Sequence, residues 1–511
     1  MTAAGIMIGL DVGSASTKAS AFTIDGKLVA QGSVGYQVYQ PEPGVAEYDA
    51  NELCRAAVGA LAAISSQIEG RRVTSIAIDA MMSGAVAINV AGKPVTPYTT
   101  TLDTRFGPEL TEFVAEHGDV LRREAGSAQA TLAPKIAWMR RSRPELNDQV
   151  AKYVLAGSLV GGHLAGLDAD DHYLDPTYLW TTGLASGRDG KWSPQLMAAA
   201  GVNAEQLPRI VACTDVIGSL SKEMAALTGL SHGVPIVAGC GDQSAGYIGA
   251  GITQPGIAAD SAGTYAVFAV ASPRFEPSHS TSGPDVAVAP VPGLFHYQHV
   301  IIGGGLTRQW AADLLDRDAD GTSMDIGSLE AQADHVGPGA DGLRFVPYLG
   351  GTATPPDARI RGGLYGLTWS HGAPEIYRAV LESVALDHAM SRKFLPQDAV
   401  IDHIVGYGGG VRSRLWNQIK CDVLGAPYEC LGAYPVTELG IALIGAQGVG
   451  GVDDAAATAR SMRHVEQVLQ PDERNHNRYL VIASEYEHLT DQHRALTDSL
   501  AIRQSNDKET T

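Results

Sequence analysis

The sequence lacks the features that mark a metal-cluster, secreted or membrane-spanning protein. Its five cysteines, at positions 54, 213, 240, 421 and 430, form no Cys-x-x-Cys pair, so neither a zinc site nor a disulfide framework is expected. It has no apolar run of about 18 residues. The N-terminal stretch MTAAGIMIGLDVG lacks the basic flank and cleavage site of a signal peptide. We therefore expect a soluble, cytoplasmic protein without a membrane partner.

Basic residues are scarce, and this limits the partners of the protein. Lysine and arginine number 37 against 56 acidic residues, which gives a formal net charge of −19, and no basic cluster is present to follow a nucleic-acid backbone. Nucleic acid is therefore not an expected partner. A chain this acidic that handles anions must do so locally, through backbone N–H groups or a metal ion. At 511 residues the chain is longer than a single hydrophobic core usually organises, which predicts two or three domains.

The order of expected helices and strands indicates the fold class. Apolar runs separated by glycine turns predict strands, and a 3.6-residue apolar period after Asp49 or Asn51 predicts a capped helix. Such alternation specifies α/β layers. The expected elements of the first part are strands at 5–13, 16–25, 26–36, 73–81 and 84–95 and helices at 49–69 and 133–145.

A second pattern resembles the first after about half of the chain. GIAADSAGTYAVFAVAS, residues 256–272, gives strand, glycine turn and strand, as GLDVGSASTKASAF does near the N-terminus. Both carry Asp, then Gly-Ser or Gly-Thr, then an apolar strand. This similarity predicts two related halves that face each other across a cleft. The expected division is an N-terminal domain at 1–252, a C-terminal domain at 253–495 and a polar tail at 496–511.

The first glycine turn, DVGSAST, has the residue types that bind phosphate oxygens. Glycine lets a phosphate approach the backbone, while hydroxyls and a lysine supply donors. The turn is not a Walker A loop and opens into a strand, so an ordinary hairpin turn is the alternative. Asp11, at the end of the preceding strand, could hold Mg²⁺ through water. The candidate phosphate ligands are Gly13, Ser14, Ser16, Thr17 and Lys18.

Two further glycine turns could complete a nucleotide site. DSAGTY offers Gly263 and Thr264 in the second half, so that facing turns would enclose a triphosphate. IVGYGGG ends a strand with Gly408, Gly409 and Gly410, and SRLWNQIKCDVL then starts a helix. Such a strand-to-helix turn lets a flat ring or a phosphate approach the backbone, although it can also be a simple tight connection.

An acid lies among small residues in VAGCGDQSAG. Asp242 follows a short apolar run that predicts a buried strand and precedes SAGYIGAGI, which predicts a helix. The alternative is a turn residue or helix cap. Ligands of α/β proteins bind where strands give way to helices, so Asp242 is a candidate functional acid.

Several longer segments carry a resemblance. The stretch GGLYGLTWSHGAPEIYRAVLE at 362–382, FVPYLGGTATP at 345–355, and GGGVRSRLWNQIKCDVLGAP at 408–427 resemble signature segments of the FGGY carbohydrate kinases, a family of the actin-like ATPase superfamily. KIAWM keeps Lys135 and Trp138 of the N-terminal signature. The resemblance covers nearly the whole chain. It implies an α/β fold of two actin-like, ribonuclease-H-like domains facing each other across a cleft.

The resemblance also implies roles for single residues. It identifies Asp242 as the general base that takes the proton of a sugar hydroxyl, with Gln243 beside it at the substrate. It implies ATP and Mg²⁺ as cofactors, with Asp11 and Asp242 at the metal. The first two glycine turns correspond to the phosphate motifs, and the triple glycine with Asn417 corresponds to the adenosine motif. A homodimer is expected by resemblance alone.

The expected sugar site departs from the pattern of the xylulose kinases of this family. Their Gln-Met-His-Gly segment is here Met81, Met82, Ser83 and Gly84, and their Trp-Asn-Asp-x-Arg is TLDTR. The alternatives are core packing for the methionines and a surface ion pair for the Asp and Arg. The predicted substrate is a ketopentose, D-xylulose first, with ribulose, erythritol and erythrulose open and a non-catalytic sugar or nucleotide sensor as the competing class. The candidate sugar ligands are Met82, Ser83, Asp103, Arg105, Asp242 and Gln243.

Overall fold

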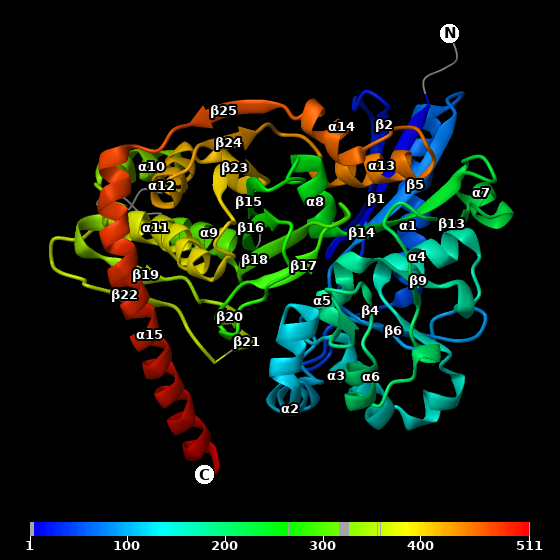
Figure 1. Cartoon of the computed structure of the whole chain (residues 1–511), viewed down its shortest axis with the longest axis horizontal. Coiled ribbons are helices and arrows are strands. Elements are labelled where there is room, and N and C mark those ends of the chain that lie inside the picture. The colour runs from blue at the N-terminus through cyan, green and yellow to red at the C-terminus, as the bar shows by residue number, and fades with distance from the viewer. Residues whose placement is uncertain (1–4, 264, 316–325, 355, 358, 510–511) are drawn as a thin grey trace.

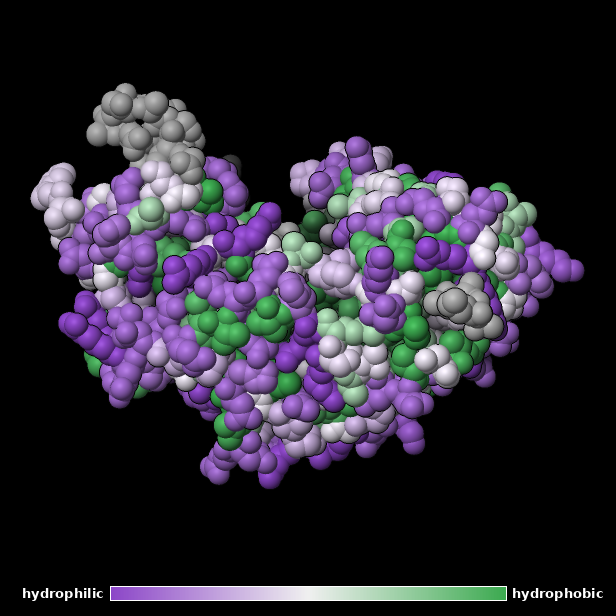
Figure 2. All heavy atoms as spheres, turned by 90° about the horizontal axis from the view of Figure 1, so that it is seen from above, coloured by the Kyte–Doolittle hydropathy of each residue, from purple (hydrophilic) through white to green (hydrophobic). Residues whose placement is uncertain are grey.

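The chain forms two α/β lobes, each built on one large mixed sheet. The computed structural model describes residues 5–263, 265–315, 326–354, 356–357 and 359–509. In Figure 1 the N-terminal half lies on the right and most of the C-terminal half on the left. Figure 2 shows the notch that separates the lobes on one side of the molecule. The two-domain α/β fold with a cleft is therefore confirmed. Within the described residues, no helix is both long and apolar enough to cross a membrane.

The first sheet has six strands in the order β13-β14-β5-β1-β2-β3. The expected hairpins at 5–36 form β1, β2 and β3, which pair antiparallel, while β5 and β14 run parallel to β1. The predicted strand at 84–95 is shorter than expected, because only Val86–Ile88 pairs as a strand. The strands are β1 (Ile6–Val12), β2 (Ser16–Thr23), β3 (Leu28–Gly35), β5 (Val73–Ala80), β13 (Val216–Ser219) and β14 (Pro235–Gly241).

The second sheet repeats this plan. Its order is β17-β18-β16-β15-β23-β24-β25, with β15, β16 and β18 antiparallel and β23 and β24 parallel to β15. Apart from the additional β17, neighbouring strands have the same relative directions as in the first sheet. The predicted relation between the halves is thus a repeated topology. The strands are β15 (Gly256–Ala262), β16 (Ala266–Ser272), β17 (Asp285–Val288), β18 (Phe295–Ile301), β23 (Ile401–Tyr407), β24 (Tyr428–Leu431) and β25 (Val465–Leu469).

Helices cover both faces of the first sheet. Side chains alternate between the faces of a strand, so Ile8 packs with the helices of one face while Met7 packs with those of the other. Asp49 caps α1 as predicted, since its carboxylate accepts from the backbone N–H of Asn51. The helices of one face are α1 (Ala50–Ser65), α4 (Ala156–Ala165) and α7 (Lys222–Thr228), and those of the other are α8 (Asp242–Ala250) and α13 (Val436–Gly448).

Helices α8 and α13 lie between the two sheets (Figure 1). The two helices pack closely because glycines lie at their interface. A Cβ on Gly249 would lie 1.8 Å from the Val436 carbonyl oxygen, and one on Gly440 would lie 2.0 Å from that of Ala245. Helix α13 comes from the second half of the sequence but covers the first sheet, where Ile441 packs with Met7. The two halves are therefore interlocked by this helix pair, and the boundary at 252/253 stays a prediction.

A smaller region inserted around the first sheet carries the expected sugar segments. Its apolar core includes Leu132, Trp138 and Tyr153. The predicted helix at 133–145 corresponds to α3. The elements are β4 (Glu47–Tyr48), β6 (Val86–Ile88), β7 (Tyr98–Thr99), α2 (Gly107–Ala125), α3 (Leu132–Ser142), β8 (Lys152–Val154), β9 (Tyr173–Leu174), α5 (Leu179–Thr182), β10 (Ala185–Ser186), β11 (Lys191–Trp192), α6 (Pro194–Ala199) and β12 (Arg209–Ile210).

The remaining helices belong to the second lobe, except for α14 (Ala455–Met462), which packs with α8 and α13 in the apolar core on the first sheet. Most of them share one apolar core, which includes Ala311, Leu381 and Trp416. The last helix continues through residues 496–509, the stretch expected as a polar tail. The elements are α9 (Gly304–Leu314), α10 (Ile326–His335), β19 (Arg344–Val346), β20 (Thr352–Ala353), β21 (Pro356–Asp357), β22 (Gly363–Tyr365), α11 (Ala373–Ser391), α12 (Arg414–Leu424), α14 (Ala455–Met462) and α15 (Glu473–Glu509).

Candidate active site

Asp242 lies where β14 passes directly into α8. Gly241 is the N-cap residue and Asp242 is the first residue of the helix. The half-buried carboxylate accepts from the backbone N–H of Gln243 at 2.6 Å, and the substrate contact of Gln243 stays a prediction. Burial and then the charge of Asp11 raise the pKa of Asp242 to about 7. A carboxyl group with this pKa is suited to accept a proton near neutral pH.

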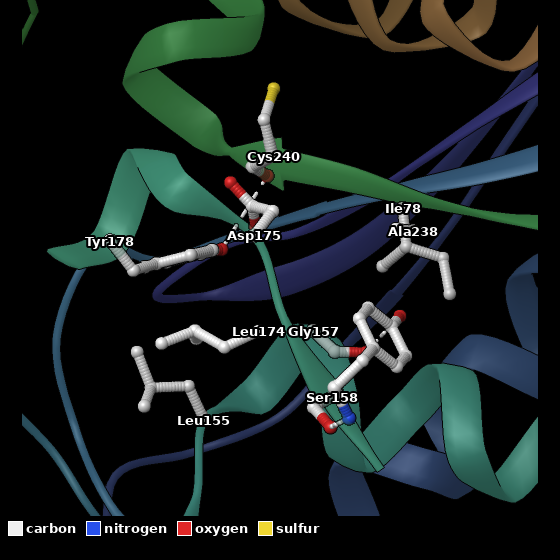
Figure 3. A pocket seen from close by; sticks show the side chains of 10 residues that line it. Ile78, Leu155, Gly157, Ser158, Leu174, Asp175, Tyr178, Ala238 and Cys240 are labelled. Carbon is white, nitrogen blue, oxygen red and sulfur yellow. Dashed lines mark hydrogen bonds between the residues drawn. The ribbon is translucent and has the colours of Figure 1, made fainter. Parts of the chain in front are cut away.

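The turn before Asp242 is held by a buried hydrogen-bond chain. The backbone N–H of Gly241 donates to Oγ1 of Thr177 at 2.9 Å, and that hydroxyl donates to Oδ1 of Asp175 at 2.6 Å. The phenol of Tyr178 donates to the Ala80 carbonyl at 2.9 Å and so ties β5 to the same segment. Figure 3 shows Asp175 and Tyr178 close to Cys240 at the end of β14, around a small cavity. Burial raises the pKa of Asp175 to about 7.

Asp11 lies on the face of the first sheet that α13 covers. Its register partner in β2 is Lys18, whose Nζ lies 3.3 Å from Oδ2 of Asp11. Its partner in parallel β5 is Asp79, which is fully buried and whose two carboxylate oxygens accept from no donor among the described residues. Burial, then the charges of Asp11, Asp242 and Glu438, the last in the first turn of α13, raise the pKa of Asp79. Several carboxyl groups therefore converge beside Asp242.

This set of oxygens fits a hard divalent cation. Mg²⁺ in phosphate-transfer sites is held by one or two carboxylates and completes its shell with phosphates and water. Within the described part of the chain, no three His, Cys, Asp or Glu side chains are already grouped to hold an ion. Asp11, near the end of β1, can supply such a carboxylate. A bound cation would neutralise phosphate charge. The predicted pairing of Asp11 with Asp242 at the metal stays a prediction.

The first glycine turn lies directly after Asp11. The N–H of Gly13 donates to the Ser16 carbonyl at 3.1 Å and closes the turn. Ser14 is exposed and Ser16 half-buried, so both can reach a ligand. Lys18 lies on the Asp11 face, whereas Thr17 is fully buried on the opposite face of β2. The turn therefore offers backbone, two serines and Lys18, and Thr17 lies within the structure beneath it.

The second glycine turn and the triple glycine lie side by side. Gly263 is exposed and has open space where a side chain would be, and Thr264 lies outside the described residues. Gly408 and Gly409 are exposed, and Cβ atoms built on them would lie 3.7 and 3.9 Å from the Ala262 carbonyl oxygen. A Cβ on Gly410 would lie 2.4 Å from that of Ala262. The two predicted nucleotide segments thus share one surface.

Asn417 lies beneath this surface. It is fully buried in α12, and its Nδ2 donates to the Val411 carbonyl at 2.7 Å and to Sγ of Cys430 at 3.3 Å. These contacts brace the turn that follows the triple glycine. The predicted nucleotide contact of Asn417 is untested, and in this structure its amide group supports the turn.

The predicted sugar residues Asp103 and Arg105 form a charged cluster with Glu47. The Nε of Arg105 lies 3.1 Å from both oxygens of Asp103, and the same guanidinium pairs with Glu47. Its carbon Cζ lies 4.3 Å from the ring centroid of Trp138. The Ala46 N–H also donates to Asp103 at 3.2 Å. Asp103 is 1% exposed, so this is a buried clamp and differs from the surface pair considered as the alternative.

The other predicted sugar residues, Met82 and Ser83, lie on the segment that follows β5. The Met82 sulfur would lie 2.1 Å from a Cβ on Gly241, so Met82 packs over the turn that precedes Asp242. Ser83 is 8% exposed, and its carbonyl accepts from the Tyr98 phenol at 3.2 Å. Lys135 is fully buried and donates to the carbonyls of Thr99 and Thr100. The signature residues Lys135 and Trp138 thus support the segment that carries Asp103.

Sequence reasoning missed several residues of this site. Asp79 could have been predicted from the sequence, because it is an acid near the end of the strand expected at 73–81, and Asp242 likewise follows an expected strand closely. Glu47 and Arg143, which meet at 3.1 Å, lie 96 positions apart, and no spacing pattern joins them. The Thr177 contact with Gly241 is equally non-local.

The comparisons with known proteins agree with this geometry. Residues 6–249 match the model of the N-terminal domain of the FGGY family of carbohydrate kinases, and residues 258–448 match that of its C-terminal domain. Gluconokinase of Bacillus subtilis is 28% identical over 477 residues, 89% of each chain. Xylulose kinase of Escherichia coli is 28% identical over 431 residues, covering 82% of this chain and 84% of the relative.

A solved structure supports the same assignment. The crystal structure of xylulose kinase from Rhodospirillum rubrum has a TM-score of 0.86 at 27% identity and covers 96% of this chain and 100% of that one. The two family models together match most of the chain, and the chain belongs to the FGGY family of carbohydrate kinases.

Proposed function

We propose that the protein transfers the γ-phosphate of ATP to a hydroxyl of a ketopentose, with D-xylulose the first candidate and Asp242 the general base. The observation that carries this proposal is the position of Asp242, at the first residue of α8 beside the Asp11 group, with a pKa of about 7. A base of this pKa is ionised in a large fraction of molecules at neutral pH and still binds a proton well.

For the transfer, the protein must mainly position the two substrates and neutralise the charge of the phosphates. The Asp242 carboxylate accepts the proton of the sugar hydroxyl while the hydroxyl oxygen forms a bond to the γ-phosphorus. The bond from that phosphorus to the bridging oxygen of ATP breaks, and ADP leaves. The turn at Gly13 and the turns at Gly263 and Gly408 belong to different sheets, so closure of the lobes would bring phosphate and sugar together and exclude water.

Charges around the sugar segment favour a neutral substrate over a sugar acid such as gluconate. Arg105 is paired with Asp103 and Glu47, and Arg143 also binds Glu47 at 3.1 Å. Lys135 is fully buried against carbonyl groups, and burial lowers its pKa to about 7. These cations are already matched, and a carboxylate placed here would add negative charge beside Asp103 and Asp242. A neutral ketose avoids that cost.

The choice among neutral sugars rests on pocket shape. Met82 and Ser83 lie where the xylulose kinases carry Met and His, and Met82 packs on the Gly241 turn. Asp103 is fully engaged by Arg105 and Ala46, so a sugar hydroxyl must replace one of these donors. Ribulose, erythrulose and erythritol remain candidates, because a shorter or differently shaped polyol fits the same chemistry.

The test is a coupled ADP assay over D-xylulose, D-ribulose, erythrulose, erythritol and D-gluconate. We expect turnover with a neutral ketose, weak or no turnover with gluconate, and a loss of about 10²–10⁴-fold in kcat for Asp242→Asn. Asp402→Asn is the control, since Asp402 is exposed in β23, the counterpart of β5 in the other sheet. ATP binding without turnover on every sugar would instead favour a sensor, and gluconate as best substrate would overturn the neutral-sugar argument.

A further inference from the structure

Asp79 is a buried acid that the proposed transfer does not use. It is fully buried near the end of β5, and neither carboxylate oxygen accepts from a donor among the described residues, while the Asp11 carboxyl lies within hydrogen-bonding reach. An ionised carboxyl group left unpaired in the interior costs several kcal/mol, so such a group is normally paired, protonated or bound to a metal. A missing partner is therefore expected at this position.

The direction of the Asp79 side chain follows from the sheet. Asp79 is the register partner of Asp11 on parallel β1, so both side chains point to the same face. Ala77, two residues earlier, lies on that face too, where a Cβ on Gly445 of α13 would be 2.8 Å from its methyl group. Asp79 therefore points to the α13 side, toward Asp11.

The charges around Asp79 call for a cation. Asp11 is the register partner of Asp79, and Asp242 and Glu438 in the first turns of α8 and α13 are further acids whose charges act on it. Lys18 pairs with Asp11 at 3.3 Å, but its side chain is 45% exposed. A bound divalent ion would remove the repulsion among these carboxyl groups.

We propose that Asp79 is a second carboxylate ligand beside Asp11 for a divalent cation, so that the chain binds the ion before ATP arrives. Two carboxylates on adjacent strands, with water and later phosphate in the remaining positions, suit Mg²⁺. This inference rests on the proposed kinase function, because the ion would serve the phosphates that bind at the Gly13 turn.

The competing explanation is a shared proton. A protonated Asp79 could donate to Asp11 and hold its orientation without any metal. The variant Asp79→Asn separates the two explanations, since the amide has the shape of the carboxylic acid and can donate to Asp11 but is a poor metal ligand.

The experiment is a titration of the full-length chain with Mn²⁺, without ATP or sugar, followed by electron paramagnetic resonance of the free ion. We expect saturable binding to the wild-type chain and to Asp402→Asn, and affinity reduced about tenfold or more in Asp79→Asn. Equal affinity in Asp79→Asn would overturn the proposal, as would no binding to the wild-type chain. Circular dichroism checks folding, and Asp79→Ser replaces Asp79→Asn if the latter is unfolded.

The kinase assay keeps this test separate from the proposed function. If the wild-type chain phosphorylates a sugar but does not bind Mn²⁺ in the absence of ATP, only the proposed role of Asp79 is overturned. Mn²⁺ binding that depends on Asp79 without phosphorylation of any sugar would overturn the kinase proposal and leave the metal site standing.

Discussion

The hydroxyl of Thr177 accepts a hydrogen bond from the backbone N–H of Gly241 at 2.9 Å. Gly241 is the residue immediately before Asp242, and Thr177 in turn donates to Asp175 at 2.6 Å. The contact therefore joins the inserted region to the strand end that positions the proposed base.

Replacing Thr177 by Val tests this link. The methyl group preserves the shape but leaves the buried Gly241 N–H without an acceptor, which costs about 1–3 kcal/mol. We expect lower stability in urea and a lower kcat, because the first turn of α8 shifts. Thr177→Ser keeps the hydroxyl and serves as the control. Wild-type kcat in Thr177→Val would show that the contact does not position Asp242.

The pKa of Asp242 predicts the pH dependence of the reaction. The base must be ionised, and its pKa is raised from 3.8 to about 7. The quotient kcat/KM for the sugar should therefore fall below about pH 7 in proportion to the ionised fraction and level off above it. A profile that stays flat down to about pH 5 would contradict the assignment of Asp242 as the base.

The same shift has a consequence for stability. Because the folded pKa of Asp242 is raised, its protonated form is favoured in the folded state, and its contribution to stability is lost as pH rises through about 7. Asp242→Asn should flatten the fall in melting temperature between pH 5 and 8, as measured by calorimetry.

Arg105 is expected to hold Asp103 in place for the sugar. Arg105→Lys keeps the charge but loses the two-oxygen contact with Asp103 and the stacking on Trp138. Losing a hydrogen bond to a charged group costs about 1.5–3 kcal/mol. We expect a higher KM for the sugar and an unchanged KM for ATP in steady-state kinetics. Equal increases in both would point to general loosening of the fold.

Gly410 and Gly409 form a matched pair at the proposed nucleotide surface. A methyl group on Gly410 would lie 2.4 Å from the Cβ of Ala262, whereas one on Gly409 meets its nearest atom at 3.6 Å. Gly410→Ala should push the Gly263 turn aside, raise the KM for ATP and lower stability by about 1–3 kcal/mol. Gly409→Ala should preserve stability in the same denaturant titration, and equal stability loss in both would argue against a steric cause at Gly410.

Local patterns predicted much of the fold because most elements depend on neighbouring residues. The hairpins of β1 to β3, the helix capped by Asp49 and the passage from β14 to α8 follow from apolar period and turn residues. The strand expected at 84–95 is short because the chain turns back at 89–93, where the Asn89 N–H donates to the Lys93 carbonyl at 2.9 Å and Ile88 bridges Pro94. Val86–Ile88 then pairs with β8, more than 60 residues away, and pairing at that distance leaves no mark on a short window of sequence.

The candidate site was predicted where function depends on residue type and missed where it depends on folding partners. Asp242, Gly263 and the triple glycine are candidates because of their own neighbours in sequence, and their roles stay predictions. The partners of Arg105 were only half found, since Asp103 is two residues away but Glu47 is 58 positions distant. Thr17 and Asn417 are buried because the packing of Tyr36 and Cys430 covers them, which residue type alone does not reveal.

The position of α13 has a consequence for synthesis of the protein. The first sheet is complete once β14 has left the ribosome, but the part of its face that α13 covers, with Met7 and Phe22, stays open until residue 448 has been made. At roughly 5–20 residues per second, that delay is on the order of ten seconds or longer. During this interval the nascent N-terminal lobe presents an apolar surface that the finished fold covers with α13.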